Sequence, residues 1–532
     1  MNKIFEQLIA KRGIDENFLK PKYEDLVDAF LLPDMAKGVE RIMRAAQEDE
    51  TVLIYGDYDV DGITASTVME ETLRLAGVKN IEIMLPDRFA DGYGMSPKVV
   101  KKAKEINAAL VVTVDCGSAN KDIINELNLL GIDTVVTDHH ECPDELPEAI
   151  AVINPKRKDA TVFRDFAGVG VAFMVARGLV QKGTIAAGKE KWLLDLVVIG
   201  TMCDSMPLVG QNRILSFYGM KVLNKTRRVG LTELMRQAGV KQINTETIGF
   251  QIGPRLNAAG RIESADLALA LVRATSRSEA AACANKLEEL NKKRKVEQTG
   301  AVNEIEERGI VDGPVIIETG EWHEGILGIV AGKLVEKYQK PAFVLTEVAG
   351  GIFKGSGRSF GEFSLAEALK NCGDSIVSGG GHAAACGLRV QTDKIWEFRE
   401  RINNYYDSLG LENQLRFLKN TEDIAVEGIK DFSLELIDEL RQLEPYGEEN
   451  TEPIFKLANI RVVEVRKMGA DQKHLSLTVE GNDGKTMRLV AFYAPEAWFR
   501  LDVDGEYDIL IQLVENVWNG VRSVEGRIVD VL

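Results

Sequence analysis

Acidic and imidazole side chains follow directly after three short apolar runs in the first third of the chain. They are Asp57, Asp59 and Asp61 after TVLIYG, Asp115 after ALVVTV, and Asp138, His139 and His140 after DTVVT. Because an open parallel sheet binds its ligands at the carboxyl ends of its strands, we expect these side chains to converge on one crevice. Crowded carboxylates repel one another, whereas divalent metal ions remove that penalty and are held well by aspartate and histidine. The pattern therefore predicts a metal centre.

The chemistry that such a centre predicts is hydrolysis of a phosphate ester. Manganese or magnesium suits mixed ligation, and two ions about 3.5–4 Å apart can clamp the attacking and leaving oxygens of a phosphoryl displacement. Taken alone, Asp57, Asp59 or Asp61 could instead cap a helix that begins near Ile63, and the two histidines could be ordinary surface residues. The combination favours the metal centre, because four of the five histidines in the chain fall in segments with a candidate function.

The runs that carry these residues indicate a doubly wound parallel α/β sheet. Between residues 51 and 155, nearly continuous apolar runs alternate with helix-like stretches, as expected for strands buried on both faces. Strands are expected at TVLIYG, IEIML, ALVVTVD, DTVVTD and AIAVIN, and helices at 63–75 and 97–105. We expect an N-terminal helical segment at 1–50 and the first domain at 51–215.

The rest of the chain predicts a second α/β domain and a small barrel. Residues 216–309 are expected to be helical and to end in a long, charged connector helix with few packing residues. A smaller α/β domain is expected at 310–405 and a helical linker at 406–442. Residues 443–532 carry five β-like runs separated by Gly, Asn and Asp turns, a pattern that suits an OB-fold barrel.

Composition narrows the class of protein. A length of 532 residues, 45% of them hydrophobic and 28% charged, is typical of a globular protein with several domains. The sequence lacks a signal-like start and an apolar run of about 18 residues, so we expect an unanchored cytoplasmic protein. Six scattered cysteines without a CxxC pair predict reduced thiols. A net charge of −17 speaks against a nucleic-acid partner, although a basic groove on an acidic body is compatible with it.

The motifs GDYDVDG, VDCG and TDHH occur in the order and at the spacing of the DHH phosphoesterase superfamily, and TMCDSMPL resembles its fourth motif. This resemblance covers the catalytic domain. The metal ligands that it implies are Asp59, Asp61, Asp115, His139 and Asp204. It also implies that Asp57 is a further acidic ligand or orients water, that Asp138 orients an imidazole, and that His140 contacts the scissile phosphate. Cys203 departs from the small residue expected before the last aspartate.

Further segments resemble the DHHA1 substrate-binding domain and RecJ-like proteins. SGGGHAAACG and GSGRS resemble DHHA1, and EWHEGILGIVAGKL, IGPRLNAAGRI and PDRFADGYG match RecJ-like segments. Arginines suit a terminal phosphate because each guanidinium donates two charge-assisted hydrogen bonds. The substrate-binding residues implied are Arg88, Arg255, Asn257, Arg261, His323, Ser356, Arg358, Ser359, Gly380, Gly381 and His382. Tight turns would explain the glycines equally well, and surface salt bridges remain an alternative for Arg255 and Arg261.

PYGEENTEPIF extends the resemblance to RecJ-like exonucleases over most of the chain. It implies metal-dependent, 5′-to-3′ hydrolysis of single-stranded DNA to mononucleotides in DNA repair and recombination, with two Mn²⁺ or Mg²⁺ ions. It further implies a monomer whose partners are a single-strand-binding protein and a helicase. In the barrel, Phe492, Tyr493, Trp498 and Trp518 could stack on bases, or they could pack in the core.

Two other functions fit parts of the pattern. Smaller DHH proteins act on short oligoribonucleotides or cyclic dinucleotides, but they lack a C-terminal barrel. A DHH-like scaffold that only binds nucleic acid or a replication partner would be expected to have lost Asp59, Asp61 or His139, and all three are present.

Overall fold

The structure, a computed structural model, describes residues 1–411, 421–426, 428–469 and 472–532. They form two compact units, each assembled from segments that are far apart in the sequence. One contains Met1–Leu26, Pro207–Phe217 and Leu415–Leu532, and the other contains Val27–Met206 and Tyr218–Gln414. No helix in the described parts of the chain combines the length and the apolar character needed to cross a membrane.

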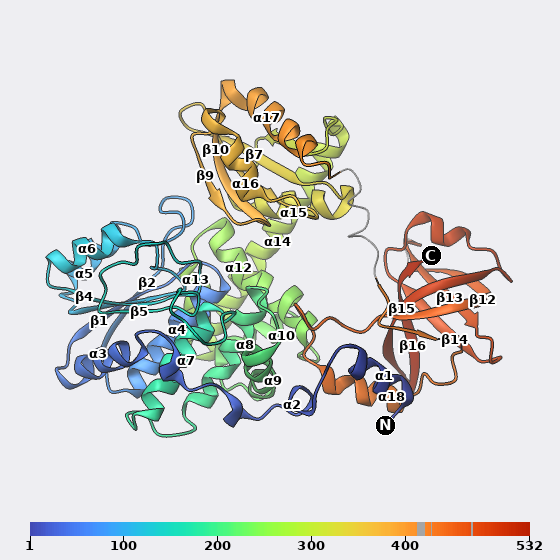
Figure 1. Cartoon of the computed structure of the whole chain (residues 1–532), viewed down its shortest axis with the longest axis horizontal. Coiled ribbons are helices and arrows are strands. Elements are labelled where there is room, and N and C mark those ends of the chain that lie inside the picture. The colour runs from blue at the N-terminus through green and yellow to red at the C-terminus, as the bar shows by residue number, and fades with distance from the viewer. Residues whose placement is uncertain (412–420, 427, 470–471) are drawn as a thin grey trace. The chain divides into compact units, whose positions relative to one another are not determined.

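The larger unit contains the predicted parallel sheet, in the order β2-β1-β3-β4-β5. Its strands are β1 Thr51–Tyr55, β2 Asn80–Met84, β3 Leu110–Val114, β4 Asp133–Thr137 and β5 Ala151–Ile153. Helices α5 (Lys98–Glu105) and α6 (Lys121–Leu129) cover one face of the sheet (Figure 1). Helices α3 (Met35–Gln47), α4 (Val60–Leu75) and α7 (Gly168–Gln181) cover the other face. The doubly wound fold is therefore confirmed.

A helical region follows this sheet. Its helices are α8 Leu194–Cys203, α9 Gly210–Leu223, α10 Val229–Gln237, α11 Thr245–Thr247, α12 Gly253–Ile262 and α13 Asp266–Arg273, with a π-helical turn at Ile248–Ile252. The predicted connector is the 32-residue helix α14 (Arg277–Arg308). It begins at Ser276, whose side chain caps the helix by accepting a hydrogen bond from the Glu279 amide. One face of α14 is buried and packs against α10, α12 and α13, so this helix contributes more packing residues than its charged sequence predicts.

The second α/β part of the larger unit has the mixed sheet β6-β7-β8-β10-β9, in which only β6 and β7 are parallel neighbours. Its strands are β6 Ile316–Gly320, β7 Ala342–Val348, β8 Ile352–Arg358, β9 Ser378–Gly381 and β10 Ala385–Gln391. Helix α15 (Leu327–Tyr338) contributes to one core, and α16 (Leu365–Asn371) and α17 (Ile395–Ser408) contribute to another.

The smaller unit is built around a closed barrel of five strands, as predicted. The strands are β12 Phe455–Met468, β13 His474–Glu480, β14 Thr486–Ala491, β15 Glu506–Trp518 and β16 Val521–Val531. Closure follows from the pairing of β12 with both β13 and β15, while β16 pairs with β14 and β15. Helices α1 (Lys3–Lys11) and α18 (Leu434–Leu440) pack on this barrel, and Ile4, Phe5 and Leu8 enter its core.

The segment expected to be a helical linker, 406–442, is helical at its start and in α18, but not between them in the described residues. Helix α17 ends at Ser408, and the short strand β11 (Ile424–Val426) pairs in parallel with β12. Residues 412–420 of the expected linker lie outside the described residues. The reason for the difference is tertiary: the segment at 424–426 completes its backbone hydrogen bonds on the edge of the barrel sheet, which local sequence does not reveal.

Candidate metal centre

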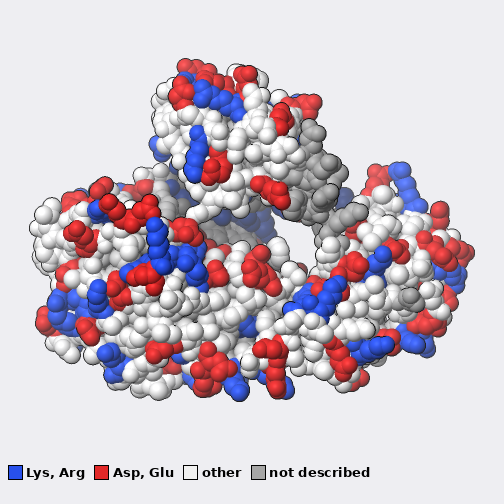
Figure 2. All heavy atoms as spheres, viewed as in Figure 1, with Lys and Arg blue, Asp and Glu red and all other residues white. Residues whose placement is uncertain are grey.

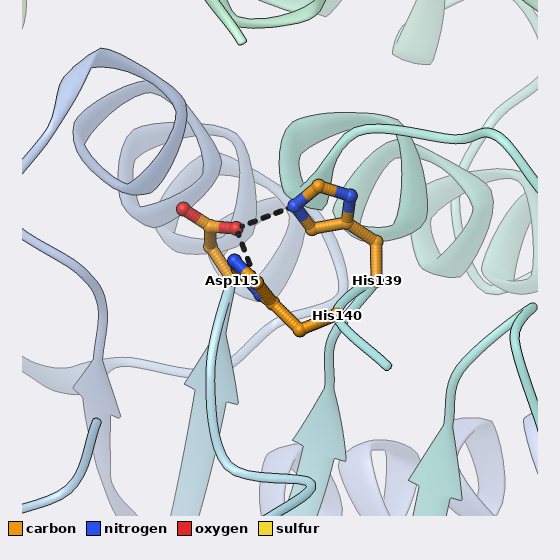
Figure 3. A group of neighbouring side chains, drawn as sticks. All are labelled: Asp115, His139 and His140. Carbon is orange, nitrogen blue, oxygen red and sulfur yellow. Dashed lines mark ion pairs between the residues drawn. The ribbon is translucent and has the colours of Figure 1, made fainter. Parts of the chain in front are cut away.

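The predicted aspartates and histidines converge at the carboxyl edge of β1, β3 and β4, as Figure 3 shows for Asp115, His139 and His140. Helix α4 starts at this edge with Asp59 as its N-cap, because the Asp59 Oδ1 accepts a hydrogen bond from the Gly62 amide at 3.0 Å. The Asp115 backbone has φ of 60°, a left-handed conformation that is uncommon outside glycine and is concentrated at functional sites.

Three overlapping groups bring one potential ligand atom from each member within 4.8 Å of the others. They are Asp57, Asp59 and Asp115; Asp61, His139 and Asp204; and Asp115, His139 and His140. The His139 Nε2 lies 3.1 Å from Asp115 Oδ1 and 3.5 Å from Asp204 Oδ2. Every aspartate and histidine that the motifs implied as a metal ligand is therefore in one cluster.

This cluster fits a divalent cation. Among the described residues, the buried atoms Asp57 Oδ1, Asp115 Oδ1, Asp204 Oδ2 and His139 Nε2 have no hydrogen-bond partner. A buried oxygen or nitrogen lone pair without a partner is costly, and divalent cations bound in the cluster would satisfy these atoms. The donor set of carboxylate oxygens and an imidazole nitrogen is one that divalent Mn²⁺ or Mg²⁺ accepts.

The pKa shifts in the cluster point the same way. Burial, followed by the charge of Asp59, raises the pKa of Asp61 to about 7, and burial with Asp61 raises that of Asp204 to about 9. Burial also raises the pKa of Asp115 well above its usual range. Without a cation these carboxyl groups would hold protons, so divalent metal ions are the natural counter-charge. The pKa of His139 is lowered to about 3 by burial and then by His140, which leaves the neutral imidazole that binds metals.

The start of helix α7 holds Asp61 in place. The amides of Gly168 and Val169 donate to its two carboxylate oxygens at 2.6 and 2.9 Å, and the helix N-terminus adds a favourable dipole. A Cβ on Gly168 would lie 2.5 Å from Asp115 Oδ1, so only glycine fits between the two aspartates. The sequence analysis did not identify this helix start, although the run of small residues in FAGVG could have indicated a close approach of the backbone to the site.

His140 is oriented by Asp138 at the same edge. The His140 Nδ1 lies 2.9 Å from Asp138 Oδ1, which also accepts the amides of His139 and His140, while Ser118 donates its amide to Oδ2. Burial alone would lower the pKa of His140, but the hydrogen bond and charge of Asp138 raise it. The ring of Tyr93, a residue that the sequence did not single out, lies 4.9 Å from the His140 ring.

Beside the metal centre lies a cluster of four arginines, which we call the arginine cluster: Arg88, Arg261, Arg294 and Arg358. Burial, and then the charges of the other three, lower the pKa of Arg261 to about 9. The guanidinium carbon of Arg88 lies 4.9 Å from the ring centroid of Tyr58. Tyr58 stands between Asp57 and Asp59 in the sequence. Partly buried guanidinium groups whose charges act on one another favour an anion such as phosphate.

Arg294 was not predicted, because it lies in the charged run NKKRK. Helical spacing could have identified it, because Leu287, Leu290 and Asn291 are buried and Arg294 lies on the same face of α14. The Arg294 NH2 group donates to Asn291 Oδ1 at 3.0 Å, whereas its Nε is buried and has no partner among the described residues.

The other predicted substrate residues have local partners of their own or are exposed. Arg358 donates to Ser356 Oγ at 3.1 Å, and His323 accepts the Gly325 amide at Nδ1. Arg255 forms an ion pair with Glu288 at 2.7 Å. The remaining ones are Asn257, which is half-buried on α12, Ser359, which donates to the Phe363 carbonyl, Gly380 and Gly381 on the exposed strand β9, and the exposed His382.

Family models match three parts of the chain. The DHH family N-terminal domain matches residues 51–201, the DHHA1 domain matches 312–408, and the RecJ OB domain matches 424–530. With the convergent acidic centre on a doubly wound sheet, these matches define the chain as a phosphoesterase of the DHH class.

Whole-chain comparisons narrow the class. The single-stranded-DNA-specific exonuclease RecJ of Bacillus subtilis is 35% identical over 98% of this chain and 67% of its own length, and that of Escherichia coli is 31% identical over 98% and 94%. The crystal structure of RecJ in complex with Mn²⁺ from Thermus thermophilus superposes with a TM-score of 0.87 at 26% identity, covering 100% of this chain and 76% of that one; the corresponding Mg²⁺ complex has a TM-score of 0.81. The chain belongs to the RecJ family and is a hydrolase of the nuclease class.

Proposed function

We propose that this protein is a metal-dependent exonuclease that degrades single-stranded DNA from its 5′ end to mononucleotides, in DNA repair and recombination. The observation that carries the proposal is the contiguity of the metal centre and the arginine cluster. Arg261 is close enough to Asp59, and Arg88 to Asp57, for their charges to act on one another. A strand whose terminal phosphate occupies the arginine cluster would have a phosphodiester within reach of the metal ligands.

In this proposal Asp59, Asp61, Asp115, His139 and Asp204 hold two divalent ions, with Asp57 close by. Asp115 belongs to two of the three ligand groups, which supports a pair of ions that share it. The Thermus thermophilus structures contain Mn²⁺ or Mg²⁺. When bound, such ions supply an activated water and stabilise negative charge on the phosphate.

The protein's own groups would hold and orient the strand. Asp138 accepts a hydrogen bond from the Nδ1–H of His140 and raises the pKa of the ring, and the protonated ring would donate its Nε2–H to a phosphate oxygen. Arg88, Arg261, Arg294 and Arg358 would fix the terminal phosphate through charge-assisted hydrogen bonds. Asn257, His323, Ser356, Ser359, Gly380, Gly381 and His382 stay predicted substrate contacts.

The barrel would bind the strand further along. Phe492, Tyr493 and Trp518 are 65%, 74% and 73% exposed, which suits rings that stack on bases, whereas Trp498 packs against the barrel core. Figure 2 shows Lys and Arg interspersed with Asp and Glu over the visible face. DNA binding by a chain with net charge −17 would therefore depend on local groups such as the arginine cluster.

The proposal includes a reducing, cytoplasmic setting, which the six unpaired cysteines support. The monomeric state and the single-strand-binding protein and helicase partners stay predictions from family resemblance.

Hydrolysis of a long, 3′-labelled single strand, compared with its duplex, tests the proposal. We expect loss of the single strand alone, in Mn²⁺ or Mg²⁺ but not in chelator, and protection by a bulky 5′ block. Destruction of dinucleotides with no attack on the long strand would instead indicate a phosphodiesterase that acts on short oligoribonucleotides or cyclic dinucleotides.

A further inference from the structure

A pocket of about 260 Å³ lies in the larger unit, where the loop after β2 meets the second α/β part. Phe89 of that loop, Trp322 and His323 supply aromatic walls, and Thr346 and Glu347 of β7 supply polar ones. Pockets for drug-sized ligands measure about 300–1,000 Å³ and combine aromatic walls with a few polar groups. This pocket therefore suits a smaller planar ligand, such as one nucleobase.

The aromatic walls are held in place by contacts within the protein. The Trp322 indole donates its Nε1–H to Glu304 Oε2 at 2.9 Å, and the Trp322 amide donates to Thr346 Oγ1 at 3.2 Å. The ring centroids of Phe89 and His323 lie 5.3 Å apart, and the two ring planes are nearly perpendicular, at 88°. A base that stacks on one of these rings meets the other edge to face, and both arrangements are favourable.

The pocket also contains a carboxylate that can distinguish between bases. Glu324 is already paired, because the Lys354 Nζ lies 2.6 Å from its Oε2. Glu347 is exposed, and its carboxylate has no hydrogen-bond or ion-pair partner in the parts of the chain that the structure describes. A carboxylate accepts hydrogen bonds and donates none. It therefore favours cytosine and adenine, which carry an amino group, over thymine, which presents a carbonyl oxygen in its place.

The turn that begins at His323 connects this pocket with two residues of the arginine cluster. The His323 Nδ1 accepts the Gly325 amide at 3.1 Å, and the Gly325 carbonyl accepts a hydrogen bond from Arg261 at 3.4 Å. Gly328, in the first turn of α15, lies against Arg358, since a Cβ at this glycine would come within 2.7 Å of the Arg358 NH2 group. A phosphate bound by Arg261 or Arg358 would therefore be near the pocket, and only one sugar separates a phosphate from its own base.

We propose that this pocket binds the 5′-terminal base of the strand, which stacks on Phe89 or His323 and donates a hydrogen bond from its amino group to Glu347. The inference rests on the proposed function, because it assumes that the terminal phosphate occupies the arginine cluster. It adds a preference: the enzyme engages a strand that begins with cytosine or adenine more readily than one that begins with thymine. Because each released nucleotide is terminal in its turn, the preference acts at every step of hydrolysis.

Release of the first nucleotide from 5′-radiolabelled strands tests this preference. The strands carry a 5′-phosphate and are identical except for the terminal unit, which is cytosine, adenine, thymine or an abasic sugar. We expect kcat/KM in Mn²⁺ to be about tenfold higher for cytosine or adenine than for thymine, the size expected for a hydrogen bond to a charged group. The abasic end, which can neither stack nor donate, should have the lowest value.

Glu347→Gln isolates the hydrogen bond. Because a glutamine amide both donates and accepts, it can bond to either kind of base, so we expect the ratio of kcat/KM between cytosine and thymine ends to fall close to one. Glu321→Gln is the matched control, since Glu321 is also exposed and precedes Trp322 but does not line the pocket. This control should keep the wild-type ratio. Loss of the ratio in both variants would reflect a general effect of charge and would overturn the assignment to Glu347.

Phe89→Ala isolates the stacking. Stacking does not depend on the identity of the base, so we expect kcat/KM to fall about tenfold for cytosine, adenine and thymine ends alike, and much less for the abasic end. An equal fall for the abasic end would contradict stacking in the pocket.

Wild-type enzyme distinguishes this inference from the proposed function. If it released no labelled mononucleotide from any of the strands in Mn²⁺, the proposed function would be wrong. Equal release from cytosine, thymine and abasic ends would leave that function intact and would overturn the pocket inference alone.

Discussion

Asp115 and His139 each belong to two of the three ligand groups, so the metal centre depends on both residues. We expect Asp115→Asn to lower metal-dependent turnover at least about 100-fold and to weaken Mn²⁺ binding, because loss even of a group that supports a ligand costs about 10–100-fold. Asparagine is preferred to alanine for this test, because it tolerates the left-handed backbone at this position. Calorimetric titration with Mn²⁺ and turnover measure the two effects, and Asp122→Asn on the exposed side of α6 is the control. Full turnover in the folded variant would contradict the assignment.

Gly168 leads to a second prediction at the residue scale. In Gly168→Ala the new methyl group would lie 2.5 Å from Asp115 Oδ1, so either Asp115 or the start of α7 must move. We expect turnover to fall about 100-fold, the size expected for a displacement of about 1 Å in a catalytic site. Gly170→Ala is the matched control, because the three atoms nearest to its Cβ all belong to Phe166, the first at 3.3 Å. Equal activity of the two variants would show that the metal centre accommodates a methyl group at position 168 without losing turnover.

The sequence predicted the residues of the centre that directly follow strands, and it missed those that tertiary packing brings in. Asp57, Asp115 and His139 converge because parallel strands end at one edge, which the pattern of apolar runs reveals. Gly168 and Arg294 reach the site through the packing of α7 and α14, which is not local in sequence. The ion pair of Arg255 with Glu288 also depends on which helices pack together. From the sequence, an arginine that forms this pair could not be distinguished from one that faces the substrate.

At the scale of elements, the turn after β14 presents Phe492 and Tyr493 to solvent in a fixed arrangement. Tyr493 has φ of 52°, and its amide donates to His474 Nδ1 at 3.0 Å, with the two rings 4.8 Å apart. A large residue held in the left-handed region indicates a conformation that the surroundings impose. The turn is therefore preorganised for stacking.

We expect replacement of Phe492 and Tyr493 by alanine to weaken binding of a long single strand about tenfold per ring, since stacking on an aromatic contributes about 1–3 kcal/mol per base. Fluorescence anisotropy in chelator measures this without cleavage. Val503→Ala, a substitution at a side chain of the same unit that is 57% exposed, should have no effect. Unchanged affinity of the double variant would remove these rings from the binding surface.

Most elements could be predicted because their apolar periodicity is strong. The helix expected at 63–75 in fact begins at Val60, since Asp59 serves as its cap as well as a candidate ligand. Strand β11 was not predicted, because three residues without strong periodicity become a strand only by pairing with β12. Helix α14 was predicted as a connector, but its buried face was not predicted, because the few buried residues are spread over 32 positions of a charged sequence.

At the scale of the whole molecule, a protein with net charge −17 must bind a polyanion through a few local contacts. We expect the logarithm of the affinity for a 5′-phosphorylated single strand to fall with the logarithm of salt concentration, and Arg88→Gln to reduce that slope by about 0.7, the value for one phosphate contact on a single strand. Titrations at several salt concentrations in chelator measure both slopes. A slope that Arg88→Gln leaves unchanged would exclude Arg88 as a phosphate contact.

The smaller unit is assembled from segments that are far apart in the chain, and this determines when it can fold during synthesis. The Asn2 amide donates to the Glu439 carboxylate, a partner 437 residues away, and α1 fills the barrel core. The ribosome therefore releases α1 long before the strands that cover its apolar face, so Phe5 and Leu8 stay uncovered until β12 to β16 have been made. The larger unit is translated in between, so a chaperone that holds apolar segments would find a long-lived target in α1.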